Sequence, residues 1–198
     1  MPIIKLHYPT GRLDKETKAI LAQKLTDVLV QMEGGANTDG GRAFAAVLFT
    51  AVAEDDWWVG GGIDDEFVAP GGKFLARVTI PEGYMNTAHK AEVHAWVTTA
   101  ILDTIGAGDD SAAGRSIQVI IDEVPEGNWG AGGRTISLES IAGSVGMSTN
   151  GSRFAWVRSY FEAKARQLAA FGYPNDAGGL LPSLIGNSRK TGDRPPRQ

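Results

Sequence analysis

Hydrophobic and polar residues alternate over the first eight positions, and this alternation predicts a β-strand. Ile4, Leu6 and Tyr8 fall on one side of that strand, and the residues between them fall on the other. The next apolar residues recur every three or four positions, the spacing of one helix face: Leu21, Leu25, Val28 and Leu29. A second apolar run at 45–49 predicts another strand. Together they predict a β-α-β unit whose two strands are parallel and joined by a right-handed crossover.

The whole pattern returns further along the chain at a constant offset of 72 residues (74 − 2 = 72). Pro2–Pro9 aligns with Phe74–Pro81, and Trp57 aligns with Trp129. The aligned helix positions are again apolar, so the second segment can bury the same helix face. The chain is therefore predicted to contain two tandem β-α-β units, at residues 1–72 and 73–148.

The predicted fold class is α+β, with tandem β-α-β units forming a four-stranded sheet that carries two helices on one face. A C-terminal helical extension follows: the apolar spacing at 152–171 predicts a helix, and residues 149–186 are expected to hold this helix and a packed loop. Residues 187–198 are rich in Arg, Lys and Pro, which predicts a disordered basic tail. The second face of the sheet has no cover within one chain, which predicts an oligomer.

Composition narrows the classes of function. Of 198 residues 42% are hydrophobic and the formal net charge is −4, which fits a soluble globular protein and argues against nucleic-acid binding. The chain has no Cys, and His89 and His94 are spaced so that they do not share one helix face, so no metal site is expected. No apolar run approaches the roughly 20 residues of a membrane span, so no membrane contact and a cytoplasmic location are expected.

Pro2 is the first residue with candidate chemistry, because it directly follows Met1. If Met1 is removed, Pro2 carries a free secondary amine, which is both a base and a nucleophile. The ring and the following strand would hold this amine in place. The alternative is that Pro2 only begins a strand, where its missing N–H does no harm.

Three segments carry a resemblance to a known family: Pro2-Ile3-Ile4, the residues 10–14, and the run 119–133 with its Asn-Trp-Gly-x-Gly-Gly turn. The chain resembles the tautomerase superfamily, specifically its members with two fused β-α-β units. The first and last segments are similar to the two ends of a 4-oxalocrotonate tautomerase subunit. The spacing up to about Arg134 is similar to that of cis-3-chloroacrylic acid dehalogenase.

The resemblance implies a homotrimer of fused chains that needs no cofactor. It implies a tautomerase, an isomerase in which Pro2 is the general base for keto-enol proton transfer. The substrate would be a small carboxylate, namely an unsaturated 2-keto or 2-hydroxy acid. By the same resemblance Arg12 binds the substrate, Gln118 stands where the tautomerase has a second arginine, and Trp129 lines the pocket.

The sequence also departs from the family. Tyr84 aligns with Arg12 and carries no charge, and Phe74 replaces a second proline. The water-activating residues of the dehalogenase fall at Ile120 and Ala131, so hydrolytic dehalogenation is not expected. Two alternatives stay open: a related hydratase or decarboxylase that uses the same proline, and a catalytically inactive oligomeric homologue. If Arg12 faces the pocket that begins with Phe74, the next candidates for the residue that binds the substrate carboxylate beside Pro2 are Arg77 and Arg134.

Overall fold

The computed structural model describes residues 2–32, 37, 39–108, 110, 112–146, 148–174 and 176–185. Its centre is a mixed sheet of four strands in the order β2-β1-β3-β4: β1 (Ile3–Pro9), β2 (Ala46–Val52), β3 (Phe74–Pro81) and β4 (Ile117–Val124). Pairs β1–β2 and β3–β4 are parallel, and the central pair β1–β3 is antiparallel. The expectations for Met1 and for a tail at 187–198 concern residues outside this description.

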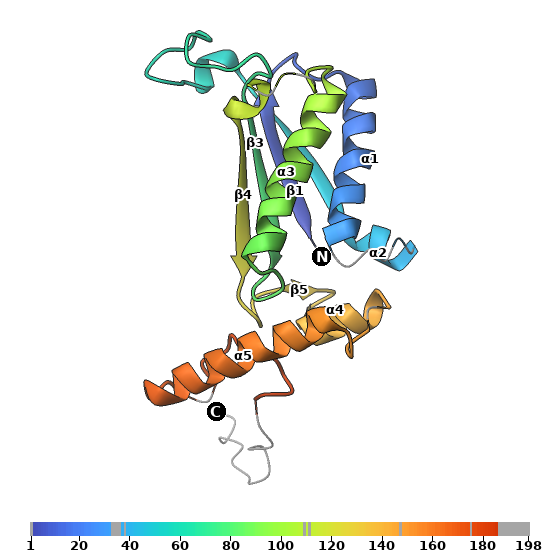
Figure 1. Cartoon of the computed structure of the whole chain (residues 1–198), viewed down its shortest axis with the longest axis vertical. Coiled ribbons are helices and arrows are strands. Elements are labelled where there is room, and N and C mark those ends of the chain that lie inside the picture. Colours follow the sequence, from blue (N-terminus) through green and yellow to red (C-terminus); the bar gives the residue numbers. More distant parts are fainter. Residues whose placement is uncertain are drawn as a thin grey trace, which may run out of the picture.

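Two long helices, α1 (Lys15–Met32) and α3 (Thr87–Thr104), cover one face of the sheet (Figure 1). Asn86 caps α3, because its side-chain oxygen accepts a hydrogen bond of 2.9 Å from the His89 backbone N–H. Asp14 precedes α1 and accepts a 2.7 Å bond from Thr17 in the same way. The predicted α+β fold class and the two helices on one face are confirmed.

The offset found in the sequence persists in the structure. Helix α1 and helix α3 begin and end at positions 72 residues apart (87 − 15 and 104 − 32). A small hairpin follows each unit: an isolated bridge joins Val59 and Gly62, and Ala131 pairs with Arg134 at the same offset between β5 (Gly130–Ala131) and β6 (Arg134–Thr135). The two units are therefore alike down to these turns.

The core lies between the helices and the alternate strand residues that face them. Ile4 and Leu6 on β1, and Val78 on β3, have no exposed surface. The opposite face of the sheet is open within one chain, where Leu48 and Ile120 are 47% and 43% exposed. Lys5 and Arg77 lie between these two residues in the same cross-strand row. A row with apolar ends on an open face is typical of a surface that another copy can cover.

The C-terminal region forms α4 (Leu138–Ser144) and α5 (Ser152–Ala170), which lie beyond one end of the sheet (Figure 1). Phe154, Val157 and Phe161 bury the inner face of α5, so this helix is part of the folded body. Helix α4 was not predicted, although Ser137 and Ser140 form a reciprocal capping box at its start. Among the described residues there are also three short helices: α2 (Asp39–Phe44), η1 (Glu54–Asp56) and η2 (Ala113–Ser116).

Candidate active site

The antiparallel pairing of β1 with β3 gives the sheet two related ends. Ile3 pairs with Thr79, and His7 pairs with Leu75. We call the end where β1 begins the Pro2 end, and the end where β3 begins the Phe74 end. Each end combines the start of one unit's first strand with the turn that precedes the other unit's long helix, so residues from both units meet at each end.

Pro2 is buried at the start of β1. By the alternation of the strand it shares the helix-facing side with Ile4, and its carbonyl accepts a 3.2 Å hydrogen bond from the Ala46 N–H. The backbone of Pro2 is thereby held against the start of β2, on the helix-facing side of the sheet. A base at this position would be shielded from bulk water.

The turn between β3 and α3 lies at the Pro2 end, and Tyr84 and Met85 of this turn are buried. Arg153 of α5 stands over the Tyr84 ring, with its guanidinium carbon 5.1 Å from the ring centroid. Its Nη1 donates to the Tyr84 hydroxyl at 3.4 Å and to the carbonyl of Met32, the last residue of α1. Arg153 therefore joins the ends of both units' helices at the Pro2 end.

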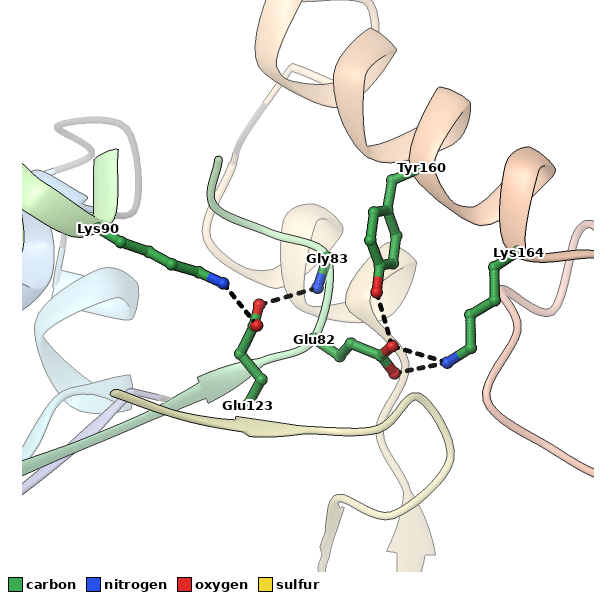
Figure 2. Close-up of polar contacts among 6 residues, drawn as sticks. All are labelled: Glu82, Gly83, Lys90, Glu123, Tyr160 and Lys164. Carbon is green, nitrogen blue, oxygen red and sulfur yellow. Dashed lines mark hydrogen bonds and ion pairs between the residues drawn. The ribbon is translucent and has the colours of Figure 1, made fainter. Parts of the chain in front are cut away.

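Glu82 in the same turn fastens α5 to the second unit (Figure 2). Its carboxylate accepts a 2.7 Å hydrogen bond from the Tyr160 hydroxyl and two 2.7 Å bonds from the Lys164 ammonium. Burial, together with the hydrogen bond to Glu82, raises the pKa of Tyr160, so this hydroxyl stays protonated and remains a donor. The neighbouring Glu123 pairs with Lys90 at 2.6 Å and accepts the Gly83 N–H at 3.3 Å.

Trp129 and Glu126 follow β4 and belong to the Pro2 end. Trp129 is half-buried, and its carbonyl accepts a 2.8 Å bond from the Ile136 N–H, which closes the hairpin β5–β6. Glu126 is buried, and both of its carboxylate oxygens accept the Leu138 N–H at the start of α4, at 3.2 and 3.1 Å. Burial raises the pKa of Glu126, and the Leu138 hydrogen bond opposes this rise.

Arg12 and Gln118 lie at the Phe74 end of the sheet. Pro9 lies seven strand steps from Pro2, roughly 23 Å along β1, and Arg12 follows in the turn after Pro9. Arg12 is exposed and donates a 3.4 Å bond to the Gly71 carbonyl. Gln118 is exposed on the open sheet face, where it pairs with Leu75. Within one chain, the structure brings Pro2 and Trp129 to one end and Arg12 and Gln118 to the other.

A cavity of about 540 Å³ opens at the Phe74 end, and Arg12, Trp57 and Lys73 line it together with Asp64 and Asp65. Lys73 is 8% exposed and its ammonium lies 3.2 Å from the Asp65 carboxylate. Phe74 is buried where the first unit has Pro2. This end therefore keeps the cation and the aromatic residue of the repeat, but Phe74 and not a proline stands at the start of its strand.

The remaining candidates for a cation differ in their surroundings. Arg77 lies on the open sheet face and forms two 2.9 Å bonds with Asp122, which lower the pKa of that carboxyl. Arg134 is exposed in β6. Arg153 was not considered from the sequence, because a single arginine near the start of a helix carries no periodic signal.

The described part of the chain holds no cluster of three His, Cys, Asp or Glu residues that could bind a metal ion. Across the same residues, no helix is both long and apolar enough to cross a membrane.

Comparison with protein families matches residues 75–139 to the family Tautomerase, described as tautomerase enzyme. Comparison with curated proteins finds no match. Among solved structures, a fused 4-OT that forms an asymmetric trimer is 22% identical with a TM-score of 0.54, over 67% of this chain and 94% of that chain. The protein N1, a member of the cis-3-chloroacrylic acid dehalogenase family, is 17% identical with a TM-score of 0.53, over 85% and 99% of the two chains.

A third structure, Pt0534 inactivated by 2-oxo-3-pentynoate, is 18% identical with a TM-score of 0.55, over 70% of this chain and 98% of that chain. At these identities the structural likenesses establish the fold, and the family match covers the second unit. The resemblance to tautomerases with fused β-α-β units is confirmed.

Proposed function

This chain has the fused β-α-β fold of the tautomerase superfamily, and we propose that it is a cofactor-free tautomerase whose general base is the amino group of Pro2. Its substrate is a small unsaturated 2-keto or 2-hydroxy acid. The observation that carries the proposal is the burial of Pro2 at the start of β1, on the helix-facing side of the sheet. A cytoplasmic location is part of this proposal.

The chemistry is a balanced proton transfer. The amine accepts the proton of the enol hydroxyl as the C–O bond becomes a carbonyl, and the resulting ammonium returns that proton to a carbon of the same molecule. An ordinary α-amino group has a pKa near 8. Burial and a nearby cation both favour the neutral amine, which brings a more basic secondary amine toward the range in which a general base works best.

The proposal includes a homotrimer. The open sheet face with Leu48 and Ile120 supports it, as do structural neighbours that are trimers. Sedimentation at micromolar concentration should give about three times the 21.0 kDa chain mass. A single species at the mass of one chain would exclude this assembly.

The substrate-binding roles proposed for Arg12 and Gln118 also depend on the oligomer. Both can act on a Pro2 site only if the Phe74 end of one chain lies against the Pro2 end of another. Trp129 needs no second chain, because it lies at the Pro2 end of its own chain. An Arg12→Ala enzyme with a raised KM and an unchanged kcat would place Arg12 in a neighbour's site. Unchanged constants would assign Arg12 to the cavity of its own chain.

The test of the proposal is a search for activity together with chemical labelling of the base. Purified protein is mixed with 2-hydroxymuconate and with enol-phenylpyruvate, and ultraviolet absorbance is followed. In parallel, 2-oxo-3-pentynoate, the compound that inactivates a structural neighbour, is expected to add once to the Pro2 nitrogen. In this addition the N–C bond forms and the proton of the amine moves to the former alkyne carbon.

Intact mass and peptide mapping locate the adduct and report how much Met1 is retained. A chain that retains Met1 has an amide at Pro2 and should be neither active nor labelled. Full activity in a sample that retains Met1 completely would exclude the amine as the base. Protein without Met1 that is neither active nor labelled would support an inactive oligomeric homologue.

A further inference from the structure

The second unit has lost the cation that its repeat partner keeps. Tyr84 stands where the first unit has Arg12, in the turn that ends at the Pro2 end of the sheet. A site that binds a carboxylate beside an amine base needs a cation there, both to hold the anion and to favour the neutral amine. Neither Glu82 nor Met85 in this turn can supply it.

Arg153 occupies the position above Tyr84. The side chain is half-buried, and no carboxylate among the described residues lies within ion-pair distance of it. Its two hydrogen bonds, to the Met32 carbonyl and to the Tyr84 hydroxyl, both use Nη1. Within the described chain, the edge formed by Nε and Nη2 has no hydrogen-bond partner. This is the edge that receives a carboxylate in two parallel hydrogen bonds.

The position of Arg153 does not depend on its own charge alone. Phe154 and Phe161 bury α5 in the body of the protein, and Glu82 holds the same helix through Tyr160 and Lys164 (Figure 2). The extension therefore carries the guanidinium to the Pro2 end on a rigid element. The loss of the Arg153 side chain leaves these anchors in place.

We infer that Arg153 is the substrate-binding cation of the Pro2 site, and that its Nε–Nη2 edge binds the carboxylate of a 2-keto or 2-hydroxy acid. The C-terminal extension thus replaces the charge that the second unit lost at Tyr84. This inference rests on the proposed function, since it takes the amine of Pro2 as the reacting group.

The experiment compares two reagents that differ in the carboxylate. The first is 2-oxo-3-pentynoate, and the second is 3-pentyn-2-one, the ynone in which a methyl group replaces the carboxylate. Rates of adduct formation at Pro2 are measured by mass spectrometry for the full-length wild type, Arg153→Gln and Arg153→Lys. Arg158→Gln is the matched control, because Arg158 is an exposed arginine of the same helix that lies over the Phe154 ring.

Arg153→Gln should slow labelling by 2-oxo-3-pentynoate about 10- to 100-fold more than labelling by 3-pentyn-2-one, the effect of losing a charged hydrogen-bonded pair. A smaller fraction of neutral Pro2 amine slows both reagents alike, so the excess measures binding of the carboxylate. The labelling rate of Arg153→Lys with 2-oxo-3-pentynoate should lie between those of wild type and Arg153→Gln, since lysine keeps the charge but lacks the two parallel N–H donors of arginine. Arg158→Gln should match wild type with both reagents. If Arg153→Gln fails to fold, the same ratio of the two rates is taken from Arg153→Lys.

Equal slowing with both reagents would assign Arg153 a structural part only and overturn the inference. Unchanged labelling by both reagents would overturn it as well, and in either case a labelled wild type leaves the proposed function standing. A wild type without Met1 that neither reagent labels at Pro2 overturns the proposed function itself, and the inference falls with it.

Discussion

The Pro2 end and the Phe74 end of the sheet are built from the same elements at the same spacing, and they differ in what lies over them. The Phe74 end keeps an exposed Arg12 and an open cavity of about 540 Å³. The Pro2 end has Tyr84 in place of that arginine, and α5 covers the turn that holds it. The repeat therefore copies the scaffold, whereas the chemistry of each end depends on a few substitutions and on the C-terminal extension.

The largest expected difference between the two ends is catalytic. Pro2→Ala should lower kcat by about 10²- to 10⁴-fold, the usual contribution of a positioned general base. Pro9→Ala is the matched control, because it removes a proline from the other end of the same strand and should leave kcat nearly unchanged. Steady-state rates with enol-phenylpyruvate or 2-hydroxymuconate give both values. Equal losses in the two variants would show that Pro2→Ala acts by disturbing β1 and not by removing a general base.

The two equivalent turn glycines should separate the ends by stability. Gly11 and Gly83 both have positive φ, of 81° and 72°, so alanine at either position should cost about 1–2 kcal/mol of unfolding free energy. A Cβ at Gly11 meets no atom within 4 Å, whereas one at Gly83 would lie 2.5 Å from the Tyr160 ring. Gly83→Ala should therefore cost about 1–3 kcal/mol more than Gly11→Ala, as measured by urea unfolding. Equal costs would mean that α5 is not seated on this turn.

The ion pair that holds the extension should matter more than a pair between the long helices. Lys164 and Glu82 are 23% and 16% exposed, whereas Lys24 and Asp103 are 39% and 47% exposed. Lys164→Met should lower the free energy of unfolding by about 2 kcal/mol, because Glu82 loses two charged hydrogen bonds. Lys24→Met should lower it by less than about 1 kcal/mol. Urea unfolding checks both values, and the reverse order would contradict the anchoring of α5 through Glu82.

The smallest expected effect is on the pH dependence of stability. Burial raises the pKa of Glu126, so the folded protein keeps this proton to higher pH than the unfolded chain does. The free energy of unfolding should then fall as pH rises from about 4.5 through the raised pKa of Glu126. Glu126→Gln should remove this decline, so its stability relative to wild type should increase with pH across the same range.

The matched control for that experiment is Glu54→Gln, since Glu54 is the repeat partner of Glu126 and is exposed at the Phe74 end. Thermal or urea unfolding from about pH 4 to pH 8 gives the comparison. A Glu126→Gln protein whose stability runs parallel to wild type at every pH would show that burial of this carboxyl costs little.

The fold could be predicted because its signals are local and occur twice. Strand alternation, helix spacing and turn glycines such as Gly11 and Gly83 each recur at one offset, so each unit supports the assignment of the other. The placement of Arg12 depends on something less local. Its position just after β1 follows from the sequence, but the antiparallel pairing of β1 with β3 decides that this end faces Phe74 rather than Pro2.

The residues that the sequence did not reveal depend on long-range contacts. Arg153 meets Met32 across 121 positions of chain, and Lys164 meets Glu82 across 82. No local pattern in the sequence predicts either pair, because each contact depends on where α5 packs in the folded protein. The start of α4 was detectable in principle from Ser137 and Ser140, but the helix is seven residues long and lies directly after the hairpin.

The position of α5 after all four strands has a consequence for the order of synthesis. Strands β1 to β4 and both long helices have left the ribosome once Val124 has emerged, and domains fold as their segments appear. The Phe74 end can therefore be completed while the chain is still growing. The turn with Glu82 and Tyr84 must wait, uncovered, until Arg153 and Lys164 have been translated. If translation pauses after Val124 and before Arg153, the nascent chain has a folded Phe74 end and an uncovered Pro2 end that chaperones can bind.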